Sequence, residues 1–184
     1  MLIALSGPSG TGKGFIKSAA LARHSSLTEL QWLTTRPLRT GENRKGNRIS
    51  ITPSRFDQLV SREQVVLVQE LYGHRYAVLK KHLLDASRPR ITEIHPGNAH
   101  EVVRIRPDIH LVGLTTDDFA LLRERLTKRG DANIDERMLA AQAEIARLTD
   151  VQHLYHVVFS FSKKTEGTLC SDVLRVIDTL LNPN

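Results

Sequence analysis

Short apolar runs alternate with amphipathic segments along most of the chain. The apolar runs predict β-strands at Leu2 to Ser6, Arg90 to His95, Ile109 to Leu114 and His156 to Ser160. The amphipathic segments predict helices at Lys13 to His24, Pro96 to Arg104, Asp117 to Lys128, Asp135 to Leu148 and Cys170 to Leu181. Short apolar strands that alternate with helices indicate a parallel sheet with helices on both faces.

A middle segment, from about Trp32 to Ala86, interrupts this alternation. It contains the short β-like pieces "RISIT", "VVLVQELY" and "HRYAV" around a helical piece, "PSRFDQLVSR". We interpret it as a small lobe, residues 32–86, inserted into one domain whose core comprises residues 1–31 and 87–184. The pattern therefore predicts an α/β protein with three layers, of helices, sheet and helices.

The composition fits one folded unit, because 184 residues of which 40% are hydrophobic suffice for a core. No apolar run approaches the roughly 18 residues of a membrane span, and the chain starts in a strand rather than a leader. We therefore expect a cytoplasmic protein with no membrane partner. The single cysteine, Cys170, has no partner for an internal disulfide and no metal-ligand spacing near it.

The net charge of +6 and the pI near 9.8 favour an anionic partner. Basic residues cluster at Arg36 to Arg55, and again at Arg123 to Arg137, where acids lie among them. Neither cluster contains the interleaved aromatic residues that stack on bases. Phosphate groups on a small molecule are the favoured partner. Nucleic acid is the alternative, and it predicts a steeply salt-dependent affinity.

A glycine-rich segment, "GPSGTGK", lies between the first predicted strand and the first predicted helix and fits G-x-x-x-x-G-K. Glycines let the backbone aim N–H groups at phosphate oxygens, and the helix N-terminus adds positive potential. Lys13 can reach the outer phosphates. The segment predicts an ATP site formed by Gly7, Pro8, Ser9, Gly10, Thr11, Gly12, Lys13 and Gly14.

The residue after Lys13 departs from this motif. The serine or threonine whose hydroxyl holds Mg2+ is replaced by Gly14, which Phe15 follows. We expect Mg2+ to accompany ATP without a direct protein ligand that the sequence can assign, held through water, another residue or the phosphates.

Two arginines, Arg36 and Arg39, stand three positions apart near the start of the predicted lobe. Two guanidinium groups can bind one phosphate bidentately, and neither loses its charge. Taken alone, an R-x-x-R pair is also typical of a solvated surface.

Several pieces together resemble the guanylate kinase family, in order and over almost the whole chain. They are "SGPSGTGKG", "TTRPLRTGE", "YGHRYAV", "ITEIHPGNA", "RERLTKRG" and "AAQAEI". The resemblance implies a P-loop NTPase core, a lobe that binds a nucleoside monophosphate, and a short arginine-bearing lid, here about residues 125–137, that closes over ATP.

The resemblance also implies roles for individual residues. Arg36, Arg39 and Tyr76 fall where the family grips the acceptor's phosphate. Three arginines fall where the family's lid and following helix meet the donor's phosphates and the transferring group: Arg125, Arg129 and Arg137. Such positive charge suits phosphoryl transfer, although acidic neighbours also allow a helix with surface ion pairs.

The chain departs from the family mainly on the acceptor side. Arg48 or Ile49 replaces a phosphate-binding tyrosine, and Leu67, Val78 and His95 replace polar residues, among them the guanine-reading glutamate. Apolar side chains leave the polar edge of guanine unpaired.

Two side chains lie at the end of the predicted Arg90 strand. A carboxylate at Glu93 could organise a metal-bound water, and His95 could contact the acceptor. Both residues also have structural interpretations, as a charge at the sheet edge and a strand-end histidine.

These observations predict an ATP-dependent kinase that phosphorylates a small phosphate-bearing acceptor, such as GMP. The related ribose 1,5-bisphosphate phosphokinase family, whose acceptor has no base, is an alternative, since its members resemble this chain at "ENRKGNRISIT" and near Leu67. A guanylate-kinase-like binding module is a second alternative. The sequence does not assign an oligomeric state.

Overall fold

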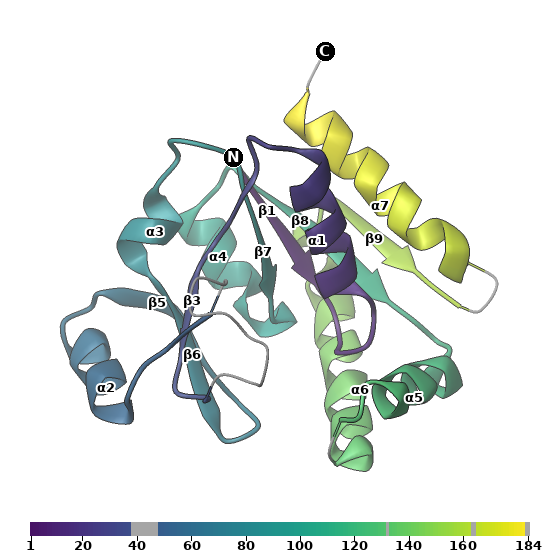
Figure 1. The fold of residues 1–184 in the computed structure, drawn as a ribbon, viewed down its shortest axis with the longest axis horizontal. Coiled ribbons are helices and arrows are strands. Elements are labelled where there is room, and N and C mark those ends of the chain that lie inside the picture. The colour runs from purple at the N-terminus through teal and green to yellow at the C-terminus, as the bar shows by residue number, and fades with distance from the viewer. Residues whose placement is uncertain (38–47, 132, 163–164, 183–184) are drawn as a thin grey trace. The chain divides into compact units, whose positions relative to one another are not determined.

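The computed structural model describes residues 1–37, 48–131, 133–162 and 165–182 of the chain (Figure 1). The chain divides into two compact units. The first unit combines Met1–Thr28 with Pro89–Asn184, and the second is Glu29–Arg88. The expected lobe of residues 32–86 lies within the second unit.

The first unit is built on a five-stranded sheet with the strand order β2-β7-β1-β8-β9. The central strand β1 pairs in parallel with β7 on one side and with β8 on the other, and β8 pairs in parallel with β9. The strands are β1 (Leu2–Ser6), β2 (Thr28–Glu29), β7 (Arg90–Ile94), β8 (Ile109–Thr115) and β9 (Val157–Ser160).

Helices flank this sheet (Figure 1). On one face α1 packs beside α7, and α4 and α6 contact β8 on the other. The helices are α1 (Lys13–Arg23), η1 (Pro96–Asn98), α4 (Ala99–Ile105), α5 (Phe119–Lys128), α6 (Ile134–Asp150), η2 (Gln152–Leu154) and α7 (Glu166–Leu181).

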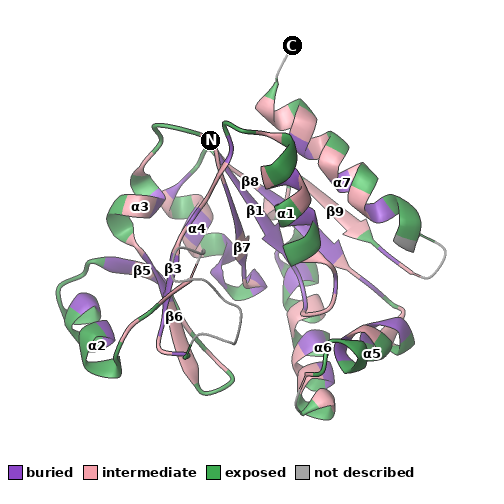
Figure 2. Cartoon of the chain, in the orientation of Figure 1, coloured by how far each residue is buried: buried purple, intermediate pink, exposed green. Residues whose placement is uncertain are grey.

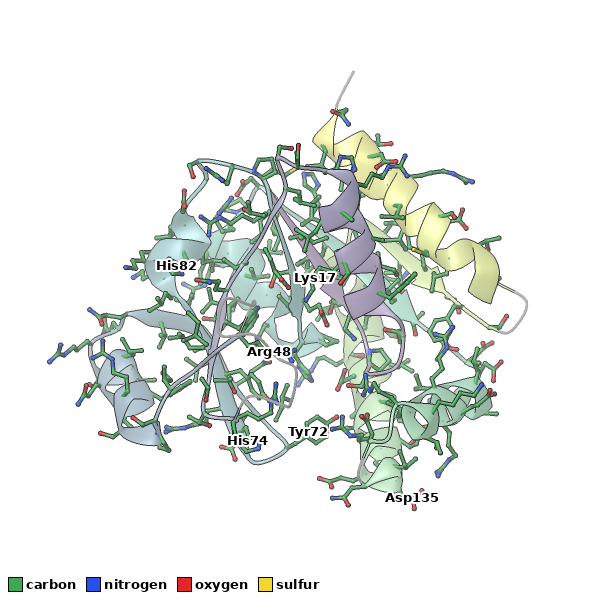
Figure 3. The ribbon with its side chains drawn as sticks, viewed as in Figure 1. Lys17, Arg48, Tyr72, His74, His82 and Asp135 are labelled. Atoms are coloured by element: carbon green, nitrogen blue, oxygen red, sulfur yellow. The ribbon has the colours of Figure 1, made fainter. Side chains whose placement is uncertain are left out.

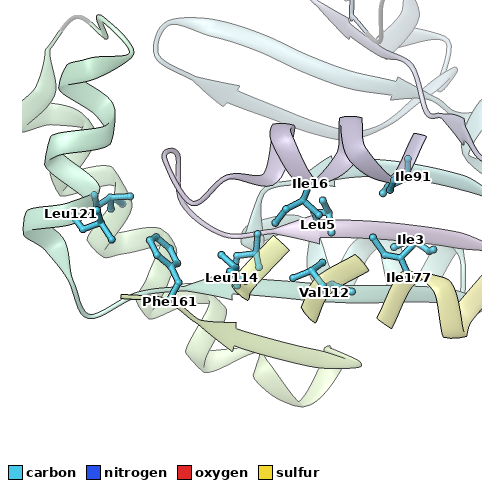
Figure 4. Packing of buried hydrophobic residues seen from close by; sticks show 14 of the residues in the cluster. Ile3, Leu5, Ile16, Ile91, Val112, Leu114, Leu121, Phe161 and Ile177 are labelled. Atoms are coloured by element: carbon cyan, nitrogen blue, oxygen red, sulfur yellow. The ribbon is translucent and has the colours of Figure 1, made fainter. Parts of the chain in front are cut away.

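The core of the first unit joins the sheet to α1, α5, α6 and α7. All five residues of β1 are buried, as Figure 2 shows, because a central parallel strand is covered on both faces. Ile3 and Leu5 of β1 pack in one cluster with Ile16 of α1 and Ile177 of α7 (Figure 4). This cluster fixes the end of β1 against the start of α1, where the glycine-rich segment lies.

The second unit contains a four-stranded sheet with the strand order β4-β3-β6-β5. β3 pairs in parallel with β4 and antiparallel with β6, which also pairs antiparallel with β5. Phe56 and Leu59 of α2 pack with residues of β3, β5 and β6. The elements are β3 (Trp32–Thr34), β4 (Arg48–Ser50), α2 (Pro53–Ser61), β5 (Val65–Leu71), β6 (His74–Leu79) and α3 (Lys80–Leu84).

The chain leaves the first unit and returns to it at neighbouring points of the first unit's sheet. The backbone N–H of Thr28, in β2, donates to the carbonyl of Pro89, just before β7, at 3.1 Å. The unit is thus an insertion between two adjacent strands.

The α/β class with a parallel central sheet is confirmed, with differences at element ends. The helix predicted from Pro96 is divided into η1 and α4, because the His95 ring accepts from the N–H of Gly97 and caps a separate 3-10 turn. The last helix begins at Glu166 rather than Cys170. Among the described residues, none of the helices combines the length and apolar character that a membrane span requires.

Candidate active site

The glycine-rich segment forms the turn between β1 and α1. Gly7 has a φ of +136°, and a Cβ there would lie 2.0 Å from the carbonyl oxygen of Leu114 in β8, so no other residue fits. Gly12, the N-cap of α1, has a φ of +89° and open space around it. Both positions require glycine's backbone freedom, and the turn leaves the N-terminal N–H groups of α1 available to an anion.

Two side chains of the loop stabilise its conformation by hydrogen bonds to loop carbonyls. The buried hydroxyl of Thr11 donates to the carbonyl of Pro8 at 2.9 Å. The Lys13 ammonium donates to the carbonyls of Gly7 and Pro8 at 2.6 and 2.7 Å. Lys13 therefore lies over the loop, where a phosphate bound to the backbone N–H groups would meet it.

Burial lowers the pKa of Lys13 from its usual value, while the carboxylates of Glu93 and Glu144 oppose this shift. A lysine in such surroundings gains from a bound anion, because the anion stabilises the charged form that burial disfavours. Strongly perturbed ionisable groups are typical of functional sites.

A second lysine, Lys17, lies one helical turn after Lys13 (Figure 3). Its Nζ donates to Oε1 of Glu93, at the end of β7, at 2.6 Å. The Lys17 side chain is only 9% exposed, and that of Glu93 is 25% exposed. Sequence reasoning missed Lys17. Its helical spacing from Lys13 was the available signal, but the partner is 76 positions away.

Arg125 of α5 contacts the loop directly. Its Nη1 donates to the carbonyl of Gly10 at 3.1 Å, and its guanidinium carbon lies 4.6 Å from the centre of the Phe161 ring. The cation–π contact and the hydrogen bond position this predicted lid arginine beside the loop.

The other two predicted arginines, Arg129 and Arg137, converge on Asp131. Nε of Arg129 donates to Oδ1 of Asp131 at 2.9 Å, and its Nη2 donates to Oδ2. Nε of Arg137 lies 3.4 Å from the same Oδ2. The Asp131 side chain is 5% exposed. Sequence reasoning treated the acids among these arginines only as partners in surface ion pairs, whereas Asp131 joins two predicted functional arginines.

Two further ion pairs of α5 and α6 are of the ordinary surface kind. Arg123 pairs with Asp135 at 2.7 Å, and Lys128 pairs with Glu124 of the preceding turn at 2.7 Å. Asp135, labelled in Figure 3, is exposed. Such exposed pairs contribute little to stability.

A histidine and a glutamate of the first unit, His95 and Glu144, lie close together. Nε2 of His95 is 4.0 Å from Oε1 of Glu144, a residue of α6 with a 12% exposed side chain. Burial raises the pKa of Glu144 to about 7, against the opposing charges of Lys13 and Arg137. Burial lowers the pKa of His95, which Arg147 and Lys13 reinforce. Glu144 is a further residue that sequence reasoning did not single out, although it lies in "AAQAEI".

The predicted acceptor-binding residues lie in the second unit. Arg36 is buried, and its N–H donates to the hydroxyl of Thr34, the last residue of β3, at 3.0 Å. Tyr76 of β6 stands opposite Thr34 in the antiparallel register. Arg36 and Tyr76 therefore both lie near the end of β3 at Thr34. Arg39 lies outside the described residues.

The residues at the guanine-reading positions are part of a packed interior. Leu67 and Val78 are both fully buried. Leu67 has a φ of +55°, at an irregularity between Val66 and Gln69 in the pairing of β5 with β6. Neither side chain offers a polar group to a base.

The described residues include no cluster of three or more histidine, cysteine or acidic side chains that could hold a metal ion. Gly14 has no hydroxyl, and a Cβ at this position would lie 3.8 Å from Oε1 of Glu93. Since Lys17 already bonds that oxygen, these residues do not fit a Mg2+ ion ligated by the protein in the usual phosphate-loop manner.

The fold and the loop define the class. A parallel sheet, a glycine-rich turn from β1 into α1 and a lysine at the start of α1 make this a P-loop nucleotide-binding protein. The crystal structure of guanylate kinase from Anaplasma phagocytophilum has the same fold, with a TM-score of 0.71, 18% identity, and coverage of 98% of this chain and 86% of that chain. A gluconokinase from Sinorhizobium meliloti 1021 is also similar, with a TM-score of 0.56, 15% identity and coverage of 97% and 92%.

Sequence comparison identifies the family. Guanylate kinase of Streptomyces kasugaensis is 33% identical over 155 residues, which are 81% of this chain and 76% of that protein. Guanylate kinase of Lactobacillus johnsonii is 30% identical over 161 residues, 83% of this chain and 78% of that protein. Comparison with protein-family models finds no match. The chain belongs to the guanylate kinase family, as the resemblance predicted.

Proposed function

We propose that the protein is an ATP-dependent kinase that transfers the γ-phosphoryl group of ATP to a nucleoside monophosphate or a similar phosphate-bearing acceptor. The observation that carries the proposal is the arrangement around the loop in the first unit. Lys13 lies over the loop, Arg125 bonds to it, and Arg129 and Arg137 converge on Asp131. Relatives that bear the name guanylate kinase support the reaction class.

In this proposal the first unit binds the donor. The N–H groups of the loop and Lys13 bind the β- and γ-phosphates. Arg125, Arg129 and Arg137 offset the negative charge that spreads over the transferring group. An oxygen of the acceptor's phosphate attacks the γ-phosphorus, the bond from that phosphorus to the β-bridging oxygen breaks, and ADP leaves with the electron pair.

The second unit binds the acceptor, with Arg36, Arg39 and Tyr76 on its phosphate. No general base is needed, because a phosphate oxygen is already ionised at neutral pH. The proposed localisation is the cytoplasm.

The burial of Leu67 and Val78 favours a second acceptor, ribose 1,5-bisphosphate. An acceptor without a base has no polar edge that would lose its partners at these positions. The two candidates share the donor site and differ only in the acceptor.

The test measures ADP release from Mg-ATP with GMP, dGMP, AMP, CMP, UMP and ribose 1,5-bisphosphate in turn, for the wild-type protein and for Lys13→Ala. We expect turnover of at least one acceptor, and its loss in the variant. A rate with GMP far above all others would exclude the ribose alternative. If no acceptor is turned over and calorimetry detects no ATP binding, the kinase proposal is refuted and a binding module remains.

A further inference from the structure

The ion pair between Lys17 and Glu93 occupies an unusual place beside the phosphate loop. Lys17 lies on α1, one turn beyond Lys13, and Glu93 lies near the carboxyl end of β7, the strand next to β1. Their atoms are 2.6 Å apart, and the lysine is almost completely buried. A buried ion pair is weak support for stability, because desolvation offsets much of the attraction. The position of this pair therefore invites a functional explanation.

The pair lies against residue 14. A side chain at Gly14 would begin 3.8 Å from the Glu93 oxygen that Lys17 bonds. In phosphate loops of this motif, a hydroxyl at that position holds Mg2+ next to the outer phosphates. Here the hydroxyl is absent, and the Lys17 ammonium is hydrogen-bonded to the neighbouring Glu93 oxygen.

Lys17 also lies close to the lysine of the loop. The pKa of Lys13 is lowered mainly by burial, and the charge of Lys17 adds to this effect. Two ammonium groups thus share the region beside the loop with the carboxylates of Glu93 and Glu144, of which Glu93 is in direct contact with Lys17. An anion placed on the loop would be attracted to both ammonium groups.

We propose that Lys17, positioned by Glu93, is a second donor-binding lysine, which supplies beside the phosphate loop the positive charge that a hydroxyl-held Mg2+ supplies in other phosphate loops. ATP binding by this protein is then largely independent of divalent metal. The inference rests on the proposed function, because it assigns Lys17 to the same ATP site. Glu93 acts as a positioning residue that holds the ammonium in place.

The first experiment measures ATP binding by calorimetry, at constant ionic strength, with excess EDTA and then with excess Mg2+. The wild-type dissociation constants are expected to agree within about threefold. Binding only in the presence of Mg2+ would overturn the inference and leave the proposed function standing. A failure to bind ATP under either condition would refute both. This comparison needs no variant, so misfolding cannot obscure it.

The second experiment uses variants. Lys17→Met keeps the apolar stem and should weaken metal-free ATP binding by at least about tenfold, as expected for loss of a hydrogen bond to a charged group. Lys17→Arg should retain most of the affinity. In Gly14→Ser/Lys17→Met the restored hydroxyl should recover affinity only when Mg2+ is present.

Two controls separate binding from folding. Lys81→Met removes an exposed lysine of the second unit and should bind ATP as the wild-type protein does. The double variant Lys17→Met/Glu93→Gln leaves no unpaired carboxylate and should show the same loss of metal-free binding as Lys17→Met, with a melting temperature nearer that of the wild type. If Lys17→Met or the double variant keeps the metal-free affinity of the wild-type protein, the pair only connects α1 to β7 and the inference is overturned.

Discussion

The buried carboxyl of Glu144 makes the stability of this protein depend on pH. Its pKa rises from the usual 4.5 to about 7, mainly because the carboxyl is buried. The folded protein therefore retains a proton that the unfolded chain releases between these two pH values. Since the folded state binds more protons, the free energy of unfolding falls as pH rises from about 4.5 to about 7.

The size of this effect follows from the shift. One pKa unit corresponds to about 1.4 kcal/mol, so keeping Glu144 ionised in the folded protein costs about 3 kcal/mol above pH 7. Glu144→Gln replaces the carboxyl by a neutral group of the same shape and removes this cost. We expect the variant to be more stable than the wild-type protein by about 3 kcal/mol at about pH 8, a rise in melting temperature of roughly 6–12 °C.

The assay is urea unfolding of both proteins at about pH 8 and at about pH 4.5. At the lower pH the unfolding free energies of the variant and the wild type should differ by less than about 1 kcal/mol. Glu136→Gln, an exposed position of the same helix, is the matched control and should change little at either pH. A stability difference between Glu144→Gln and the wild type that is absent, or equal at both pH values, would refute the reasoning. Burial lowers the pKa of His95, so the His95 ring is neutral at about pH 8 and adds no competing charge there.

Three further variants test the loop and the arginines. Lys13→Ala should weaken ATP binding by at least about tenfold in calorimetry, because the anion loses its direct ammonium contact; unchanged affinity would remove Lys13 from the site. Asp131→Ala should lower turnover about tenfold without preventing ATP binding, because Arg129 and Arg137 lose the carboxylate on which they converge. Higher turnover would instead show that the carboxylate competes with phosphate. Gly7→Ala should abolish ATP binding and lower the unfolding free energy by about 3 kcal/mol or more, since its Cβ would overlap the carbonyl oxygen of β8; a stable variant that binds ATP would contradict the loop geometry.

The sequence predicts the buried parts of the fold well. The strand Leu2–Ser6 was predicted to the residue, because a parallel strand buried on both faces is a continuous apolar run. The short elements β3 and α3 were not predicted. β3 has three residues, and α3 has five residues with polar side chains at its start, so both are too short for the pattern to repeat recognisably.

Prediction of the site was limited by contacts between distant parts of the chain. The loop was recognisable because its residues are consecutive, and Lys13 lies over it as the motif suggests. Lys17 resembles any lysine on a helix surface until its contact with Glu93 is seen. In the same way, Glu144 gains its unusual pKa only from burial and from charges on other elements.

The way in which the second unit joins the first has a consequence for evolution and engineering. The residues of the first unit that flank it, Thr28 and Pro89, are joined by a backbone hydrogen bond of 3.1 Å. An inserted segment whose two ends lie close together can be replaced by another segment with a similar distance between its ends, and the path of the chain through the core stays the same. Residues 29–88 are thus a natural cassette. If the second unit binds the acceptor as proposed, grafting the corresponding segment of a relative into this chain would transfer that relative's acceptor choice and leave the proposed ATP site of the first unit unchanged.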